Sequence, residues 1–130
     1  MHVAATRGYV GMMIWLKENG ADINAINRGG DMPLHEAAFH GQAETVVWLI
    51  EQGADVNAKC SSILEMYAER QGRTPMHCAA EGGHVEVMRW LKRLGADINA
   101  EDENGWMSMG LAVEEKHDEA VKWLKANGGK

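Results

Sequence analysis

One six-residue stretch occurs three times in this chain, and no other feature of the sequence constrains the fold as strongly. It reads Gly-Ala-Asp-Ile-Asn-Ala at residues 20–25 and 95–100, and Gly-Ala-Asp-Val-Asn-Ala at residues 53–58. Recurrence of one stretch along a chain is the signature of a repeat protein. We therefore expect similar structural units that stack on one another, because a single unit of this size cannot bury its own apolar face.

Two further markers set the length of the unit at 33 residues. His2 and His35 are 33 residues apart, whereas His35 and His77 are 42 apart, so nine extra residues are inserted once. Four tryptophans keep the same register and follow positions 2, 35, 77 and 110 by 13 residues: Trp15, Trp48, Trp90 and Trp123. The register divides a single domain, 1–130, into a partial unit at 1–25, full units at 26–58 and 59–100, the latter with an insertion near 60–70, and a C-terminal cap at 101–130.

Each unit is predicted to contain two helices. Thr74 and Pro75 suit the N-cap and the first position of a helix, and Gly83 then separates that helix from a second one. In the last unit we expect helices at 108–115 and 118–127, with the charged surface that a terminal unit needs. Because the chain starts within a unit, we expect it to be a piece of a longer protein.

These residues resemble the ankyrin repeat. Residues 74–84 read Thr-Pro-Met-His-Cys-Ala-Ala-Glu-Gly-Gly-His and are followed by the six-residue stretch at 95–100, and residues 33–41 are close to the same motif. The resemblance implies an all-α solenoid of stacked helix-turn-helix units with β-hairpin-like fingers. It also implies that a partner protein binds on the concave side, at the finger tips and the first helix of each unit.

The four repeated tryptophans have two interpretations. They either fill the same core position of each second helix and form a stacked column, or they form a surface on which a ligand stacks. Their identical register on an apolar helix face favours the core.

Trp106 belongs to the last finger, at the position that Asp31 and Arg73 occupy in the other units. We expect these finger positions to be exposed, and the two polar residues fit that expectation. Because tryptophan is enriched in binding hot spots, Trp106 is a candidate contact for a partner. The alternative is that its ring packs over the inserted segment or over its own helix.

Phe39 is the only phenylalanine, and it follows two alanines on a first helix. Glu81 and Glu114 occupy the same position in the next two units, and His40 is the neighbour of Phe39. If the resemblance holds, this position faces the concave groove. We therefore expect these residues to share one face with the finger residues, although a lone exposed aromatic side chain is also common.

The insertion is the most individual part of the chain. Ser62 and Glu65 fit a capping box, and Ile63, Met66 and Tyr67 follow at helical spacing. A helix of about two turns is therefore predicted there. Its apolar side must cover something, which is either its own repeat or, through Tyr67, an extra wall of the groove.

Composition excludes several functions. The formal net charge is −6 without a Lys/Arg cluster, so neither nucleic acid nor an anionic membrane is an expected partner. Cys60 and Cys78 show no metal or disulfide spacing, which favours a reducing, intracellular compartment, cytoplasmic or nuclear. The sequence holds no catalytic motif, and we expect no cofactor, no metal and no small-molecule ligand.

The sequence therefore predicts a non-catalytic module that binds another protein or peptide. The candidate partner-binding residues are Asp31, Phe39, His40, Tyr67, Arg73, Glu81, Trp106 and Glu114. Because Glu36 and the acidic run at 101–103 join Glu81 and Glu114, we expect a partner segment that contains Lys or Arg.

Two other readings stay open. The chain could be a structural spacer or regulatory arm of a larger protein whose activity lies in another domain. The ankyrin resemblance also nominates Asn24, Asn57 and Asn99 as targets of asparagine hydroxylation, although these side chains more simply cap the finger turns.

Overall fold

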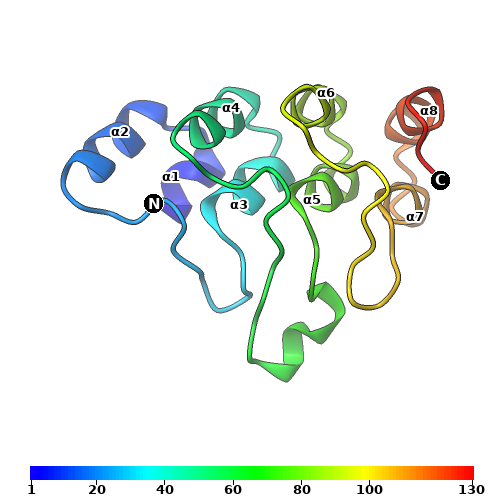
Figure 1. The fold of residues 1–130 in the computed structure, drawn as a ribbon, viewed down its shortest axis with the longest axis horizontal. Helices are drawn as coiled ribbons and strands as arrows, with labels where there is room; N and C mark the ends of the chain where they lie inside the picture. The colour runs from blue at the N-terminus through cyan, green and yellow to red at the C-terminus, as the bar shows by residue number, and fades with distance from the viewer.

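The computed structural model describes residues 1–130 and is built from helices without any β-strand. Its elements are α1 (His2–Arg7), α2 (Val10–Glu18), α3 (Pro33–Phe39), α4 (Ala43–Glu51), the 3-10 helix η1 (Glu65–Arg70), α5 (Pro75–Gly82), α6 (Val85–Arg93), α7 (Ser108–Glu114) and α8 (Asp118–Ala126). Figure 1 shows the helices side by side in pairs, with long loops that project from one side of the stack. The architecture is an all-α repeat solenoid, which confirms the predicted fold class.

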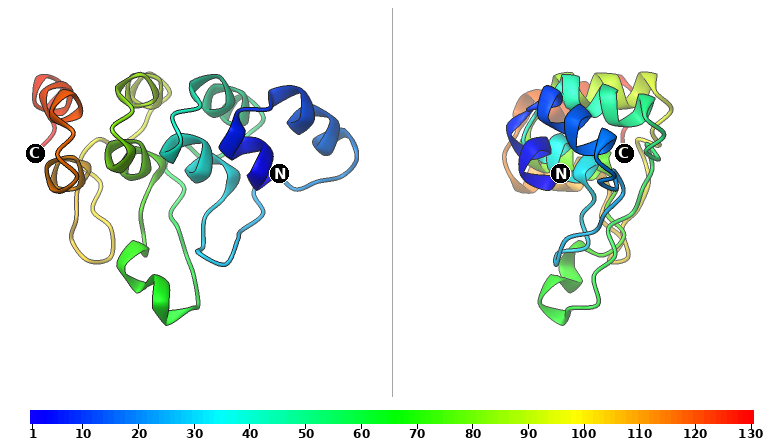
Figure 2. Two further views of the ribbon diagram at one scale, coloured as in Figure 1. Left: turned by 180° about the vertical axis from the view of Figure 1, so that it is seen from behind. Right: turned by 90° about the vertical axis from the view of Figure 1, so that its left-hand side faces the viewer.

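The helices form two layers, seen edge-on in Figure 2. The first helices of the units, α1, α3, α5 and α7, form one layer, and the second helices, α2, α4, α6 and α8, form the other. Small side chains let neighbouring first helices approach closely, as Ala37, Ala38, Ala79 and Ala80 are all fully buried. Leucines of the second helices fill the space between the layers, and Leu49, Leu91 and Leu124 have no exposed surface.

The repeated tryptophans do not form the core column that their register predicted. Trp15 is 60% exposed, and the other three rings are only partly buried. The core position belongs to the next residue of each helix, which is leucine in all four units. Since neighbouring residues on a helix point about 100° apart, a leucine in the core turns the tryptophan before it toward the surface. The prediction of a buried column is therefore wrong.

Local sequence accounts well for the start and end of the helices. The Thr74 hydroxyl accepts a hydrogen bond from the N–H of His77, and Pro75 opens α5. Gly83 then ends this helix at φ +73°, a left-handed conformation that favours glycine. The last unit has Lys116 at the equivalent turn, and this residue adopts φ +58°. The last unit therefore has the same left-handed turn as the others, although a lysine takes the place of glycine.

The fingers, which are the loops that join each second helix to the next first helix, are hairpin-like. Their backbones pair locally, as in the hydrogen bond from the N–H of Cys60 to the carbonyl of Arg73 at 2.8 Å. Neighbouring fingers are also joined, through the N–H of Ser61 and the carbonyl of Gly30 at 3.1 Å. The loops therefore form one continuous layer without regular strands.

Histidines attach the first helices of the first three units, α1, α3 and α5, to a finger. His77 Nδ1 accepts from the N–H of Thr74, which leaves the Nε2 proton to bond the carbonyl of Trp106 at 2.8 Å. His35 makes the same pair of contacts, with the N–H of Met32 and the carbonyl of Ala58. Burial lowers the pKa of both histidines, so their rings are neutral in the folded chain.

Two histidines at another repeat position, His84 and His117, join neighbouring units. Each one contacts the end of the first helix of the preceding unit. His117 Nε2 bonds the carbonyl of Glu81, at the end of the preceding first helix, at 2.9 Å. His84 bonds the carbonyl of Phe39 in the same way, and burial lowers its pKa. These two histidines therefore have a structural role at the turns between neighbouring units.

The insertion differs from its prediction. The helix begins at Glu65 rather than directly after Ser62, is of the 3-10 type and is kinked at Tyr67. Ser62 donates to the carbonyl of Arg28 and accepts from the N–H of Leu64, so it does not cap a helix through Glu65. Ile63 is fully exposed, so the expectation that an apolar side covers something is wrong for this residue.

Candidate functional site

A hollow of about 550 Å³ opens on the face that the first helices share with the fingers. We call it the Trp106 hollow, and its lining comes from the insertion, the last finger, α5 and α7: Glu69, Arg70, Arg73, Glu81, Asn104, Trp106, Leu111, Glu114 and Glu115. Four of the eight candidate residues meet here, namely Arg73, Glu81, Trp106 and Glu114. The hollow is therefore the place where the sequence-based candidates converge.

Both cations of this hollow are paired within the chain. Arg73 lies 2.8 Å from a carboxylate oxygen of Glu81 and 3.5 Å from one of Asp102. Arg70 lies 2.9 Å from a carboxylate oxygen of Asp31.

The lining contains more carboxylates than arginines. Glu69, Glu114 and Glu115 are exposed, and none of them forms an ion pair within the chain. Like charges gathered in a hollow beside low-dielectric walls raise the local potential. The Trp106 hollow is therefore negative and suits a positively charged ligand group.

Trp106 is held in place at the rim of this hollow. Its backbone N–H donates to a carboxylate oxygen of Asp102 at 2.8 Å, and its backbone carbonyl accepts from His77. Its ring lies directly against Gly110, where a Cβ atom would be only 2.8 Å from the ring. The ring thus packs on its own helix, one of the alternatives given above, yet it stays 41% exposed and available for contact.

The expectation that the finger positions are exposed is wrong for the two polar residues. Asp31 is 2% exposed and Arg73 is 8% exposed, because each one sits in a buried ion pair. Trp106 alone of the three has a substantially exposed side chain. Asp31 and Arg73 therefore shape the hollows rather than present a free charge.

Tyr67 lies in a second hollow, between the insertion and the preceding finger. We call it the Asp31 hollow, and its volume is about 420 Å³. Asn27, Arg28, Gly29, Asp31, Glu36, Tyr67 and Arg70 line it. Arg70 lines both hollows, so its ion pair with Asp31 connects them.

Phe39 and His40 lie outside both hollows. Phe39 is partly buried against the core, and its ring meets that of His40 edge-on with the centroids 5.1 Å apart. His40 is exposed and lies 3.6 Å from Glu36, one helical turn earlier. The structure therefore does not place these two residues beside Trp106.

Sequence reasoning missed the role of Arg70, Glu69 and Glu115. Arg70 and Glu69 lie in the insertion, where the sequence analysis singled out only the aromatic Tyr67 as a contact. The partner of Arg70 is Asp31, 39 residues away, and no local spacing indicates such a pair. Glu115 follows the predicted Glu114, and only the hollow shows that both residues line the same space.

One buried cluster has the residue types of a metal site. Ligand atoms of Asp31, His35 and Cys60 all lie within 4.8 Å of one another. Their lone pairs and protons are already used, since the Cys60 thiol donates to Asp31 at 2.9 Å and both nitrogens of His35 bond backbone groups. A hydrogen bond with Cys78 and burial raise the pKa of the Cys60 thiol, which disfavours the thiolate that metals bind. The cluster therefore fits a structural hydrogen-bond network better than a metal.

Comparison with known protein families is consistent with this geometry. A family described as "Ankyrin repeats (many copies)" matches residues 1–50, and one described as "Ankyrin repeats (3 copies)" matches residues 61–130. Among curated proteins, none matches the chain. None of the helices is long and apolar enough to cross a membrane.

Proposed function

Because the chain belongs to the ankyrin-repeat family, whose repeats are in general protein–protein interaction modules, we propose that it is a non-catalytic module that binds a partner protein at the Trp106 hollow. The observation that carries this proposal is the arrangement of three unpaired carboxylates around an exposed, positioned indole ring. The partner presents a segment with Lys or Arg at this hollow.

The chemistry of such a contact follows from the lining. The aliphatic stem of a Lys or Arg lies on the ring of Trp106, and the cation is attracted by the ring face and by the carboxylates. Glu114 and Glu115 supply those carboxylates from α7, and Glu69 supplies one from the insertion. Hydrogen bonds fix the backbone of Trp106 and its ring packs on Gly110 before the partner arrives, so ordering this residue costs little entropy on binding.

The insertion extends the binding surface in this proposal. Tyr67 lines the Asp31 hollow beside Arg28, and the exposed Ile63 and Met66 lie in the same segment. A partner that follows the fingers would meet this segment after leaving the Trp106 hollow. Phe39 and His40 would contact only a partner that also reaches along the first helices.

The buried, unpaired thiols of Cys60 and Cys78 support an intracellular location, because disulfides do not persist in a reducing compartment.

Paired affinity capture from cell extract tests the proposal. The first bait is the unchanged chain, and the second carries Trp106→Ala, Glu114→Gln and Glu115→Gln. The control bait carries Asp118→Asn and Glu119→Gln, which remove two exposed charges from α8, outside the hollow. Circular dichroism confirms that all three baits are equally helical.

We expect a protein that the unchanged and control baits retain and the hollow variant loses. Equal retention by all three baits would contradict binding at the Trp106 hollow. Absence of any retained protein would favour the spacer or regulatory arm.

A further inference from the structure

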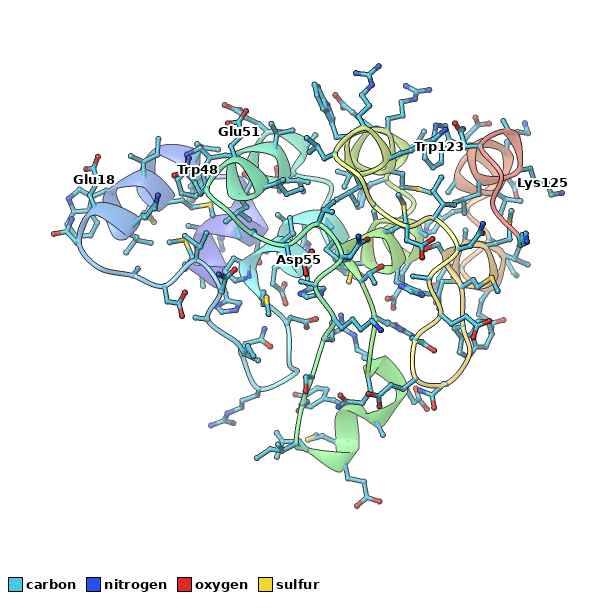
Figure 3. All side chains as sticks on the ribbon, viewed as in Figure 1. Glu18, Trp48, Glu51, Asp55, Trp123 and Lys125 are labelled. Carbon is cyan, nitrogen blue, oxygen red and sulfur yellow. The ribbon has the colours of Figure 1, made fainter.

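Two hollows of opposite charge lie on the layer of second helices. We call this side of the stack, which α2, α4, α6 and α8 form, the back face, and it points away from the fingers. Figure 3 shows Trp48 and Glu51 on α4 and Trp123 between α6 and α8, all away from the fingers. Neither the stacking of the units nor the proposed function uses the charges of this face.

The first hollow lies between α4 and α6 and combines an apolar lining with negative charge. Its volume is about 380 Å³, and its apolar residues are Val10, Ala43, Val47, Trp48 and Trp90. Its charged residues are all exposed carboxylates, Glu44, Glu51 and Glu86. None of them forms an ion pair within the chain. The hollow therefore suits a cation on an apolar stem, which is the chemistry of Lys and Arg.

Helix stability does not account for the carboxylate of Glu51. This residue ends α4, and the last turn of the helix holds no basic side chain. The helix dipole is negative at this end, so a carboxylate there is unfavourable. Since no ion pair within the chain offsets this cost, a cation from outside the chain explains Glu51 better than the fold does.

The second hollow lies between α6 and α8 and is positive. Its volume is about 350 Å³, and it is lined by Arg89, Lys92, Arg93, Trp123 and Asn127. The three cations are exposed, and none of them forms an ion pair within the chain. Lys92 is held at the hollow by a hydrogen bond of 2.8 Å from its Nζ to the side-chain oxygen of Asn127. This hollow therefore suits carboxylates.

Helix α6 separates the two hollows. Packed helices lie about 8–10 Å apart, so the grooves on the two sides of α6 are separated by a similar distance. This distance corresponds to about seven residues, or two turns, of an α-helix. A single partner helix that crosses α6 can therefore place one charged group in each hollow when the two groups are about two turns apart.

We propose that the back face binds an α-helix of a partner protein that is acidic at its start and basic at its end. Its first turn places Asp or Glu over the hollow between α6 and α8. Its last turn places Lys or Arg over the hollow between α4 and α6, where the apolar stems contact Trp48 and Trp90. The direction follows from the helix dipole, because carboxylates at the start and cations at the end also stabilise the partner helix itself.

This site is separate from the one in the proposed function. The Trp106 hollow belongs to the first helices and the fingers, and none of its lining residues lines either hollow of the back face. A partner at one face therefore leaves the other free, and each proposal can fail without the other.

Two-dimensional proton–nitrogen NMR of the full chain tests the proposal, with a synthetic peptide as the probe. The peptide is about 15 residues long, the length at which an isolated helix becomes marginally stable, with glutamates in its first turn and lysines in its last. Single Trp→Phe variants assign the indole N–H resonances. We expect those of Trp48, Trp90 and Trp123 to shift when the peptide is added, and that of Trp106 to stay in place.

Matched variants locate the two ends of the peptide. Glu44→Gln/Glu51→Gln/Glu86→Gln should weaken binding roughly tenfold, and Arg89→Gln/Arg93→Gln should weaken it to a similar extent, because each set removes one end's partners. The control variant Glu115→Gln changes a charge of the Trp106 hollow and should leave the affinity unchanged. A second peptide with lysines at both ends should bind less tightly, since one end then meets the cations of α6.

Unchanged resonances of Trp48, Trp90 and Trp123 would overturn the proposal. Equal affinity of the two peptides would overturn it as well, because the face would then only attract cations. Shifts of these resonances with protein concentration alone, before any peptide is added, would assign the back face to a second copy instead. A shift confined to Trp106 would overturn this proposal and leave the proposed function standing.

Discussion

The repeated stack and the inserted segment are held together by different physics. Leucines, alanines and neutral histidines occupy equivalent positions in successive units, and nearly all are buried. The insertion instead leaves Ile63 and Met66 exposed and is fixed by polar contacts, above all the ion pair between Arg70 and Asp31. The difference indicates that periodic positions stabilise the fold, whereas the aperiodic ones shape the surface at which we propose that a partner binds.

The largest effect should come from the periodic core. Leu91→Ala removes a side chain without exposed surface and should lower the free energy of unfolding by about 2–5 kcal/mol. Trp15→Ala, at a ring that is mainly exposed, should cost much less although the removed side chain is larger. Urea unfolding of both variants measures the difference. An equal loss of unfolding free energy in both variants would contradict the assignment of the leucines to the core and the tryptophans to the surface.

A smaller and more local effect is expected in the insertion. Arg70→Met leaves the buried carboxylate of Asp31 without its cation and should cost about 1–3 kcal/mol. Hydrogen exchange should accelerate for amides of the insertion while those of α6 stay protected. Adding Asp31→Asn should restore part of the loss, because the buried charge is then removed. Uniform acceleration through the whole chain would contradict a local role.

The helix turns offer a matched pair of changes. Gly83→Ala should destabilise by at least about 1–2 kcal/mol, because φ is +73° and the new Cβ would lie 2.6 Å from His117. Lys116→Gly at the equivalent turn should stabilise by about 1 kcal/mol, since it relieves a left-handed non-glycine residue. Thermal unfolding checks both signs. A stabilising Gly83→Ala would show that the turn is not under this constraint.

The smallest effect concerns pH. Burial lowers the pKa of His77 in the folded chain, against an opposing contribution from Asp102, so below about pH 6.5 the unfolded chain binds more protons. Stability should therefore fall as the pH drops from about 7.5 to 5.5. His77→Gln should therefore reduce this pH dependence. Urea unfolding of the unchanged chain and of the variant across the pH range measures it, and an equal pH dependence of the two chains would contradict this account.

Sequence patterns correctly predicted those helix ends that neighbouring residues in the chain determine. Thr74 and Pro75 start α5 as expected, and the helices predicted at 108–115 and 118–127 are present within one residue at each end. Periodicity alone could not decide between Trp90 and Leu91, because both residue types recur in every unit and turning the helix by about 100° exchanges them. The stack places the leucine inside.

Tertiary contacts explain why the rest of the prediction failed. The capping box at Ser62 was outweighed by a hydrogen bond to Arg28 in the preceding finger, 34 residues away. Asp31 was expected at the surface, because its cation, Arg70, lies in a segment without a counterpart in the other units. The Trp106 hollow was therefore predicted in part, through Arg73, Glu81, Trp106 and Glu114, and its walls became visible only in the structure.

The central claim is that a partner contacts the Trp106 hollow, and fluorine NMR of the tryptophans tests it most directly. The chain is labelled with 5-fluorotryptophan, Trp106→Phe assigns the resonance of Trp106, and the captured partner is then added. We predict that the Trp106 resonance shifts on binding and that raising the salt concentration weakens the shift. An unchanged Trp106 resonance, with shifts confined to the four tryptophans of the back face, would contradict the claim.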